Sequence, residues 1–286
     1  MLKKLRFESS NGKAVQLYGS PYRLYFVEGL GVVEVELQVQ HAPYQDGSMF
    51  IDALLQERHI TIELRINASS EIELAKLKMN LSSTLSPKLG LGKLIHEDPS
   101  GTKEIMAICN NVPFFPDGET NRGPLFQKAL ITLIAPNPYW LDPEKKTREL
   151  KAYEGDFTFP FEFPVQFGIE SDSTTIYNEG DTEAPVVVEI NGPITRPLIE
   201  NITTGEHMQI NAIIQADQTL VIDTSPRNKR VEIRSENETR KVMGFFDHSG
   251  DFWLLAPGEN EIRYRADAGI AEATATVSWQ SQYVGI

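Results

Sequence analysis

Histidine side chains are the first place to look for catalysis or metal binding in this sequence. None of the five forms the HxxxH or HExxH spacing that lets a helix hold zinc: His41, His59, His96, His207 and His248. The most ligand-like group is Asp247–Asp251, because an oxygen-rich turn can bind calcium, but it lacks the EF-hand spacing. The sequence therefore favours a plain turn at this position and no metal site.

Nucleophiles and paired carboxylates give no catalytic pattern either. The single cysteine, Cys109, excludes an internal disulfide framework and a cysteine-based zinc cage, and no GxSxG nucleophile elbow is present. The segment Gly90–Lys93 lacks the spacing of a phosphate loop. Glu259 and Glu261 share one face of a predicted strand, but in so acidic a region they are better interpreted as solvated surface. We therefore predict a protein that is not an enzyme and needs no cofactor, with a cell-wall hydrolase as the least favoured class.

The acidic charge is concentrated in the second half of the chain. Over all 286 residues, 40 acidic and 27 basic side chains give a net charge of −13. Residues 1–150 contain 17 basic and 18 acidic side chains (net −1), whereas residues 151–286 contain 10 and 22 (net −12). A surface of this sign repels phosphate, so we expect no stable binding to nucleic acid or to anionic membranes.

The sequence contains no recognisable membrane or export signal. No segment approaches the ~18 consecutive apolar residues of a membrane span. Charged residues interrupt the first twelve positions, which therefore lack the apolar core of a signal peptide. We expect synthesis in a reducing cytoplasm without export, in agreement with the single cysteine.

A proline-rich stretch predicts the boundary between two domains. Five prolines fall within 29 positions: Pro136, Pro138, Pro143, Pro160 and Pro164. Between them, residues 144–149 are charged and offer no face to bury, and proline removes a backbone donor, so the stretch suits neither a helix nor a central strand. At roughly 150 residues per domain the chain fits two. We divide it into residues 1–150 and residues 151–286.

The first half is predicted to mix strands with one long loop. Val33–Gln40 and Ile60–Ile66 alternate apolar and polar residues, which predicts two half-buried strands. The connection between them, 41–58, is predicted to be irregular, and a loop of this length is uncommon without a function. It also contains apolar side chains that a solvated loop does not need: Met49, Phe50, Ile51, Leu54 and Leu55.

One helix is predicted after these strands. Ser70 and Glu73 have the spacing of a capping box and precede a leucine stripe with i, i+3, i+7 periodicity, which predicts a helix over about 71–84. Three further strands are predicted at 91–96, 104–109 and 127–134. The first domain is therefore expected to be mainly β with a single helix.

The second half reads as short strands separated by turns, which is typical of a β-sandwich or jelly roll. The strands are expected at Val186–Ile190, Pro197–Ile202, His207–Ile210, Thr219–Ile222, Lys229–Ile233, Trp253–Leu255, Glu261–Tyr264 and Glu272–Trp279. An aromatic side chain such as Trp253 can stack on a sugar ring when exposed, but among alternating apolar residues a place in the core is the preferred interpretation.

Two segments of the first half carry a resemblance to a known family. Thr132–Trp140 reads TLIAPNPYW and closely resembles the ending of the N-terminal domain in distal tail (Dit) proteins of siphovirus-type phages that infect Gram-positive bacteria. Gln45–Gly47 and Glu57–Ile62 are similar to that family's "D-G … R-x-I-x-[IL]" stretch. The resemblance implies an N-terminal β-sandwich-like domain with a helix and a galectin-like C-terminal sandwich that points outward.

The same resemblance implies a structural role at the virion tail tip. Distal tail proteins form homohexameric rings that join the tail tube to a tail-associated fibre or lysin and, in many phages, to receptor-binding proteins. The ring leaves a lumen for the tape measure protein and DNA. Residues 1–150 would then form the ring and residues 151–286 the outward-facing domain, in a protein made in the cytoplasm of the bacterial host.

Two expectations about surfaces follow from this function. A ring needs contacts that close on themselves, so we expect Met49, Phe50, Ile51, Leu54 and Leu55 to reach a neighbouring subunit. The alternative function is a carbohydrate-binding adhesion module that acts through the C-terminal sandwich, with Trp253 as the stacking residue.

Overall fold

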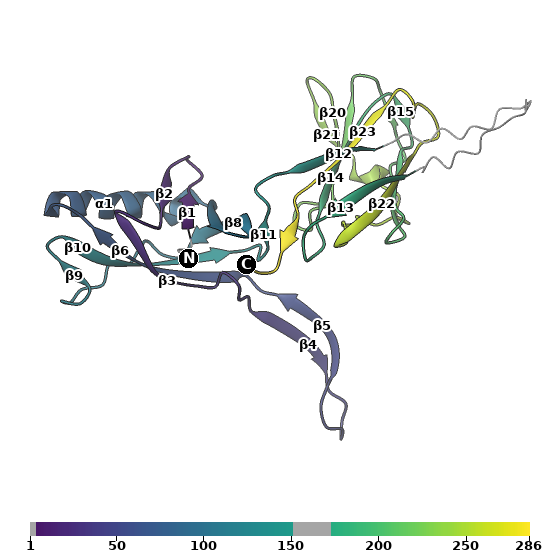
Figure 1. The fold of residues 1–286 in the computed structure, drawn as a ribbon. Helices are drawn as coiled ribbons and strands as arrows, with labels where there is room; N and C mark the ends of the chain where they lie inside the picture. Colours follow the sequence, from purple (N-terminus) through teal and green to yellow (C-terminus); the bar gives the residue numbers. More distant parts are fainter. Residues whose placement is uncertain (1–3, 151–172) are drawn as a thin grey trace, which may run out of the picture. The chain divides into compact units, whose positions relative to one another are not determined.

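The computed structural model describes residues 4–150 and 173–286, which form two compact units (Figure 1). Unit 1 comprises Met1–Pro143 together with Tyr283–Ile286, and unit 2 comprises Glu144–Gln282. The predicted mainly-β fold is confirmed, with one α-helix among the described residues. None of the described helices is long and apolar enough to cross a bilayer.

Unit 1 is built on a continuous antiparallel sheet whose longest pair joins β6 (Arg58–Asn67) to β10 (Phe126–Ala135) over ten residues each. Side chains of β6 alternate between buried and partly exposed, because one face of the strand packs into the core. The strands run in the order β2 (Ala14–Gln16), β1 (Lys4–Glu8), β7 (Gly92–Asp98), β8 (Gly101–Cys109), β10 (Phe126–Ala135), β6 (Arg58–Asn67) and β3 (Tyr22–Glu28). The short strands β9 (Arg122–Gly123) and β11 (Trp140–Leu141) pair with β10 and β8.

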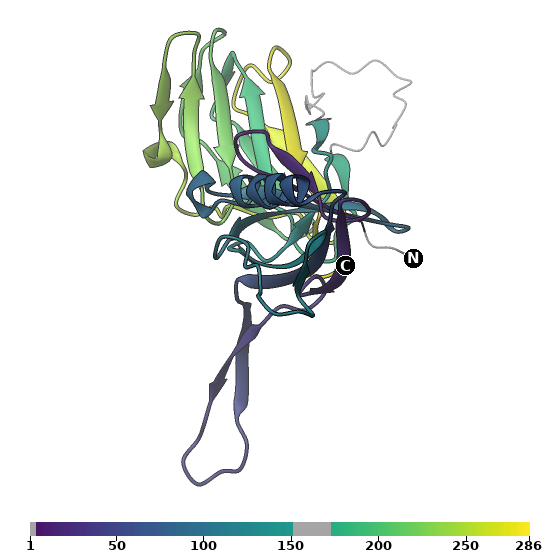
Figure 2. The same ribbon diagram turned by 90° about the vertical axis from the view of Figure 1, so that its left-hand side faces the viewer.

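Helix α1 (Glu71–Thr84) has the predicted bounds and lies over the sheet of unit 1 (Figure 2). Ser70 Oγ accepts a hydrogen bond from the Glu73 backbone N–H at 3.2 Å, as the capping box requires. The reciprocal bond is shifted by one residue, because the Glu73 carboxylate accepts from the Ser69 backbone N–H at 2.7 Å and from the Ser69 hydroxyl. These bonds hold the pKa of Glu73 below its usual range. A 3₁₀ turn, η1 (Pro87–Leu89), follows the helix.

The segment between the first two predicted strands is a β-hairpin, and the prediction of an irregular loop over 41–58 is wrong. Among the described strands, β4 (Val35–Gln40) and β5 (Met49–Leu55) pair only with each other, and they project from the rest of unit 1 (Figures 1 and 2). All six residues of β4 are exposed, so the half-buried strand predicted at Val33–Gln40 is also wrong. The alternation there reflects two faces of different polarity, neither covered by the described residues of this chain.

Unit 2 is built from two larger antiparallel sheets around one apolar core. The six-stranded sheet contains β12 (Lys146–Leu150), β23 (Thr274–Trp279), β14 (Val186–Asn191), β19 (Thr219–Asp223), β20 (Arg230–Arg234) and β21 (Thr239–Lys241). The four-stranded sheet contains β13 (Ser173–Asn178), β22 (Gly258–Arg265), β16 (Leu198–Asn201) and β17 (Glu206–Gln209). The remaining elements of unit 2 are β15 (Ile194–Thr195), β18 (Ile213–Ile214) and η2 (Met243–Phe245), whereas β24 (Gln282–Tyr283) pairs with β11 in the sheet of unit 1.

Two local predictions for unit 2 need correction. Lys146–Leu150, interpreted as linker, is strand β12, because its backbone pairs along β23 although its side chains are largely exposed. The segment Trp253–Leu255 is not a strand, and only Leu255 makes an isolated bridge, to Ala184. Pro160 and Pro164 of the predicted linker lie outside the described residues. The ring-forming and outward-facing roles of the two predicted domains stay predictions.

Candidate functional site

The hairpin β4–β5 has one face that is entirely apolar. Residues directly opposite each other on paired strands point to the same face. Val35 pairs with Leu55, Leu37 with Ala53 and Val39 with Phe50. We call these six residues the apolar face: Val35, Leu37, Val39, Phe50, Ala53 and Leu55. The opposite face contains Glu36, Gln38, Gln40 and Asp52, together with Met49 and Leu54.

A β-bulge makes this face continuous. The register shifts between Gln38 and Val39, whose partners are Asp52 and Phe50, so Ile51 is the additional residue of the bulge. Without the bulge, alternation would place Phe50 on the opposite face, among the polar side chains. The five predicted contact residues therefore differ in position, because Phe50 and Leu55 lie on the apolar face, Met49 and Leu54 oppose it, and Ile51 forms the bulge. Their role as subunit contacts stays a prediction.

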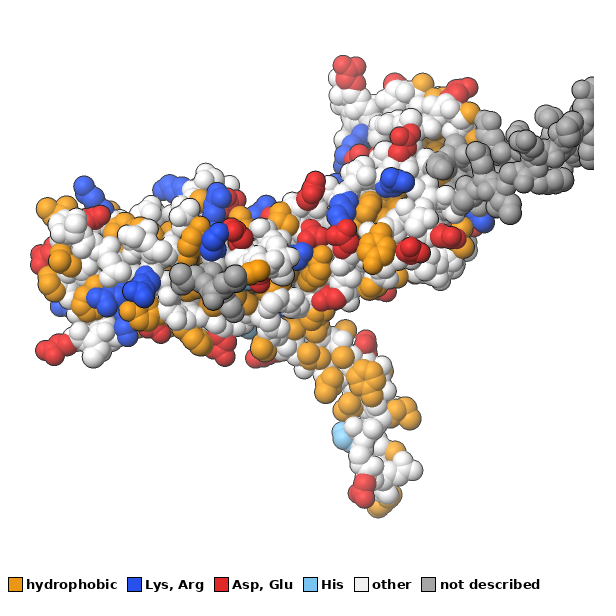
Figure 3. All heavy atoms as spheres, viewed as in Figure 1, with side chains coloured by type: hydrophobic (Ala, Val, Ile, Leu, Met, Phe, Trp, Pro, Cys, Tyr) orange, Lys and Arg blue, Asp and Glu red, His pale blue; other side chains and the backbone are white. Residues whose placement is uncertain are grey.

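The apolar face is unusually exposed for its composition. Leu37 is 60% exposed and Phe50 is 62% exposed, and the side chains along the hairpin are largely apolar in Figure 3. An isolated two-stranded hairpin is at best marginally stable in water. Covering a large apolar side chain stabilises an association by about 1.5–3 kcal/mol. These properties favour a hairpin that is stabilised by a protein surface packed over it.

We call the stretch before β4, Gly29–Val32, and the start of β6 at Arg58 the root of the hairpin. One buried arginine, Arg58, holds this root together. The Arg58 side chain is 0% exposed and donates to backbone carbonyls only. Its Nε donates to Pro138 O at 2.9 Å and its Nη1 to three carbonyls, Gly29 O at 3.1 Å, Leu30 O at 2.9 Å and Val32 O at 3.0 Å. Its Nη2 donates to Val284 O. Burial lowers the pKa of Arg58, but an arginine stays charged in proteins, so these carbonyl dipoles replace its hydration.

This arrangement ties both ends of the hairpin together. Gly29–Val32 lies shortly before β4 and Arg58 follows β5, so the guanidinium joins the incoming chain to the outgoing one. Trp140 is fully buried and its Nε1 also donates to Leu30 O, at 2.9 Å. Gly29 has a φ of +88°, and an added Cβ would lie 1.9 Å from the carbonyl oxygen of His59, so only glycine fits there.

Residues of the two resemblance motifs meet at this root. Arg58 belongs to the motif Glu57–Ile62, and Pro138 and Trp140 belong to the motif Thr132–Trp140; the structure brings these three residues to one point. Their residue types and spacing alone indicate no such role. The available signal was an arginine at the start of an otherwise alternating strand, but its acceptors are backbone atoms that no side-chain pattern reveals.

Comparison with known proteins identifies the family. Residues 179–283 match the family model of a siphovirus-type tail component, C-terminal domain, and residues 20–135 match that of a phage tail protein RIFT-related domain. The crystal structure of the Dit protein of phage SPP1, a paradigm of the hub adsorption apparatus in Gram-positive infecting phages, superposes with a TM-score of 0.69 at 12% identity, covering 99% of each chain. The chain belongs to the siphovirus distal tail protein family.

Chains from a second phage share the fold of this distal tail protein. The activated baseplate of phage p2 matches in its calcium form with a TM-score of 0.52 and 11% identity over 100% of each chain. Its strontium form gives a TM-score of 0.51 and 12% identity over 97% of this chain and 98% of that one. No curated protein sequence matches the chain. The protein is thus a structural tail or baseplate component of a virion, and its relatives are structural tail proteins that assemble with other tail components.

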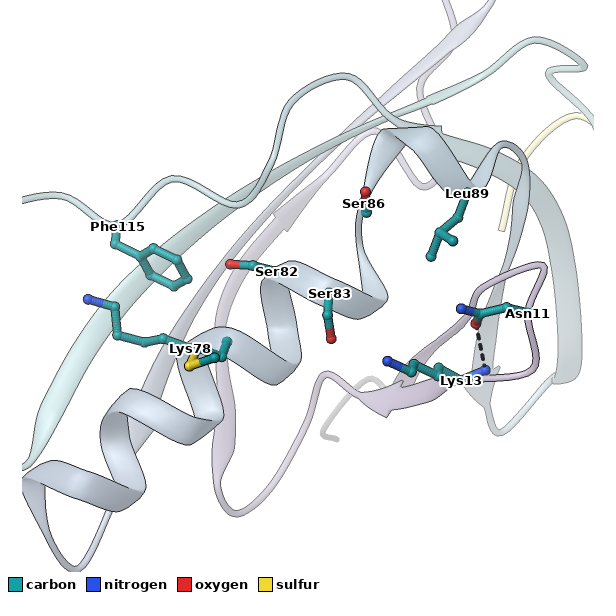
Figure 4. A pocket seen from close by; sticks show the side chains of 9 residues that line it. Asn11, Lys13, Lys78, Ser82, Ser83, Ser86, Leu89 and Phe115 are labelled. Atoms are coloured by element: carbon teal, nitrogen blue, oxygen red, sulfur yellow. Dashed lines mark hydrogen bonds between the residues drawn. The ribbon is translucent and has the colours of Figure 1, made fainter.

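An open groove of about 740 Å³ lies beside α1 in this distal tail protein (Figure 4). It is lined by Asn11, Lys13, Lys78, Met79, Ser82, Ser83, Ser86, Leu89 and Phe115. Lys78 extends toward Phe115, with its Nζ 4.8 Å from the ring centre. Ser83 Oγ donates to the backbone carbonyl of Asn80. These lining residues include no histidine and no carboxylate.

Asp247, Glu259 and Glu261, the candidates for metal binding and acid–base chemistry, lie in a turn and on an exposed strand face. Asp247 Oδ1 accepts from the Ser249 backbone N–H at 3.0 Å and from the Ser249 hydroxyl at 2.9 Å, which lowers the pKa of Asp247 and closes the predicted turn. Glu259 and Glu261 are both exposed on β22. Within residues 4–150 and 173–286, no three His, Cys, Asp or Glu side chains group closely enough to hold a metal ion.

Trp253 lies in the core of unit 2, which corrects its assignment as a sugar-stacking residue. Its side chain is 0% exposed, and its Nε1 donates to Ile199 O at 3.3 Å. A sugar ring stacks only on an aromatic face that it can reach, and the face of this indole is covered by apolar neighbours. Trp253 is therefore a core residue, as its alternating apolar neighbours in the sequence indicate.

Cys109 is expected to be unreactive in the folded protein. Its side chain is 4% exposed, and burial raises the pKa of the thiol to about 12, so almost no thiolate is present at pH 8. We expect a disulfide reagent such as Ellman's reagent to label no thiol in buffer and one thiol per chain in denaturant. Rapid labelling in buffer would contradict the burial of Cys109.

Proposed function

We propose that this chain forms a homohexameric ring at the tip of the phage tail. The ring joins the tail tube to the tail-associated fibre or lysin and, where present, to receptor-binding proteins, and its lumen admits the tape measure protein. The number of copies and these partners are what resemblance to the distal tail family implies. Gram-positive bacteria are the expected hosts, with synthesis in the host cytoplasm.

The observation that carries the proposal is the exposed apolar face of the hairpin. Val35, Leu37, Val39 and Phe50 are 46%, 60%, 41% and 62% exposed. They lie on a two-stranded sheet to which no other strand of the described residues is paired. In a closed ring, every subunit contacts its neighbour through the same pair of surfaces. The apolar face of the hairpin could therefore make the same contact in every subunit.

Native mass spectrometry of the full chain tests this function. Over a concentration series, we expect a species with the mass of six chains to replace the monomer as concentration rises, because assembly follows mass action. Negative-stain electron microscopy of that species should show six-fold rings with a central hole. A chain that stays monomeric both at the highest concentration and after mixing with the tail tube protein would contradict the proposal.

The alternative function, a carbohydrate-binding adhesion module, has lost its candidate residue, since Trp253 is buried. No other observation on unit 2 favours it over the structural function. We also expect no stable binding to nucleic acid, because a net charge of −13 opposes the approach of phosphate.

A further inference from the structure

The segment Tyr283–Ile286, here called the return segment, belongs to unit 1 although it follows all of unit 2 in the sequence. It is anchored by a partly buried polar group. The Tyr283 hydroxyl donates to Asp142 Oδ2 at 3.2 Å, and Lys103 Nζ lies 2.5 Å from Asp142 Oδ1. The same Lys103 Nζ lies 3.8 Å from the centre of the Tyr283 ring, so a cation–π contact adds to the ion pair.

Beyond this anchor, the return segment lies against the root of the hairpin. The Val284 carbonyl accepts from Arg58 Nη2. A Cβ added to Gly285 would lie 3.1 Å from the carbonyl oxygen of Gly31, so the two glycines pass in close contact. Ile286 packs against the core of unit 1. The return segment therefore approaches, at Gly31, the same stretch, Gly29–Val32, whose carbonyls Arg58 binds.

The Val284 carbonyl accepts from a nitrogen of Arg58, Nη2, that the other four carbonyls do not contact. Nε and Nη1 bind Pro138, Gly29, Leu30 and Val32, whereas the described acceptor of Nη2 is Val284 alone. Without that acceptor, one arm of a buried cation would lack a partner, which is costly in an interior from which water is excluded. The guanidinium would then turn toward water and weaken its bonds to the hairpin's root.

We infer that docking of the return segment fixes the hairpin at its root, and that Arg58 is the positioning residue that couples the two. The inference rests on the proposed function only in its second part: a hairpin held at one angle presents the apolar face to a second copy, and a loosened hairpin does not. The first part concerns one chain and is tested without assembly.

Amide hydrogen exchange on dilute, monomeric protein tests the first part. The variants are a chain ending at Gln282, which removes the return segment, and Tyr283→Ala, which removes the anchor but keeps the Val284 carbonyl in the chain. Val284→Ala is the matched control, because it keeps both the anchor and the carbonyl. In the first two variants, amides of residues 28–34 and 55–59 should exchange about tenfold faster or more, since one hydrogen bond to a charged donor changes an opening equilibrium by at least that factor. Helix α1 should exchange as in the unchanged chain.

The outcomes separate the inference from the function on which its second part rests. Unchanged exchange at the root in both variants would overturn the coupling. Faster exchange throughout unit 1, including α1, in both variants would also overturn it, because the segment would then support the whole unit and not the root. With the root loosened selectively, native mass spectrometry should find the shortened chain monomeric where the full chain forms rings. A full chain that never forms rings would refute the proposed function but leave the exchange result standing.

Discussion

Replacing Leu37 and Phe50 together with lysine is expected to leave this protein monomeric and folded. Both side chains lie on the apolar face, where they are 60% and 62% exposed, and neither belongs to the core of unit 1, so the substitutions leave that core intact. At a subunit contact the two lysines would lose about 1.5–3 kcal/mol each of apolar burial, which weakens each contact at least about a hundredfold. Native mass spectrometry should show six-copy species for the unchanged chain and monomers for the variant, at equal concentration.

The opposite face of the same hairpin supplies the control. Gln38→Lys with Gln40→Lys adds the same charge to the same hairpin, on the face that already contains Glu36 and Asp52. Rings should persist in this variant. Rings that survive the Leu37 and Phe50 substitutions as well would show that subunits meet elsewhere, and the apolar face would then need another occupant.

Replacing Arg58 with methionine is expected to destabilise unit 1 by about 3–5 kcal/mol. Methionine fills much of the volume but donates no hydrogen bond, so carbonyls of Gly29, Leu30 and Pro138 would lose a donor in a buried place. Cys109 provides the measurement, because it is the single thiol of the chain and is buried in the core of unit 1. Its labelling across a urea series should report the unfolding of unit 1 at a lower midpoint in the variant.

Arg122→Met is the matched control for that measurement. Arg122 pairs with Asp117 at 2.8 Å, but the two side chains are 64% and 85% exposed, and such surface pairs contribute at most about 1 kcal/mol. The urea midpoint for Cys109 should hardly change in this variant. Equal shifts of the urea midpoint for Arg58→Met and Arg122→Met would mean that the hydrogen bonds from Arg58 to the buried carbonyls stabilise unit 1 no more than a surface ion pair does.

The sequence predicted the elements whose signals are local. Ser70 sets the start of α1 through its own hydroxyl, and the alternation over Ile60–Ile66 marks one face of β6 as core. The hairpin was missed for a physical reason. The bulge at Ile51 breaks the period-2 pattern in β5, and the alternation in β4 was interpreted as burial, although the apolar face has no cover within the described chain.

The root of the hairpin was beyond sequence reasoning because its chemistry is carried by backbone atoms. Arg58 is the only charged member, and its acceptors come from the stretch before β4, from Pro138 and from Val284. Nothing in the side chains of Leu30 or Val284 indicates that their carbonyls will meet a guanidinium. The resemblance motifs did contain Arg58 and Trp140, so the family pattern located the residues while only the structure gave them a role.

The sequence distance between Arg58 and Val284 has a consequence for synthesis of the protein. The two are 226 residues apart, and unit 2 lies between them. At translation speeds of about 5–20 residues per second, the ribosome adds Val284 on the order of ten seconds or more after Arg58. During that interval a nascent chain exposes its hairpin before the arginine's shell is complete. Neighbouring nascent chains on one messenger RNA would therefore meet before Arg58 has its Val284 acceptor. Stable contacts between their hairpins would form only after each chain has been synthesised through Val284.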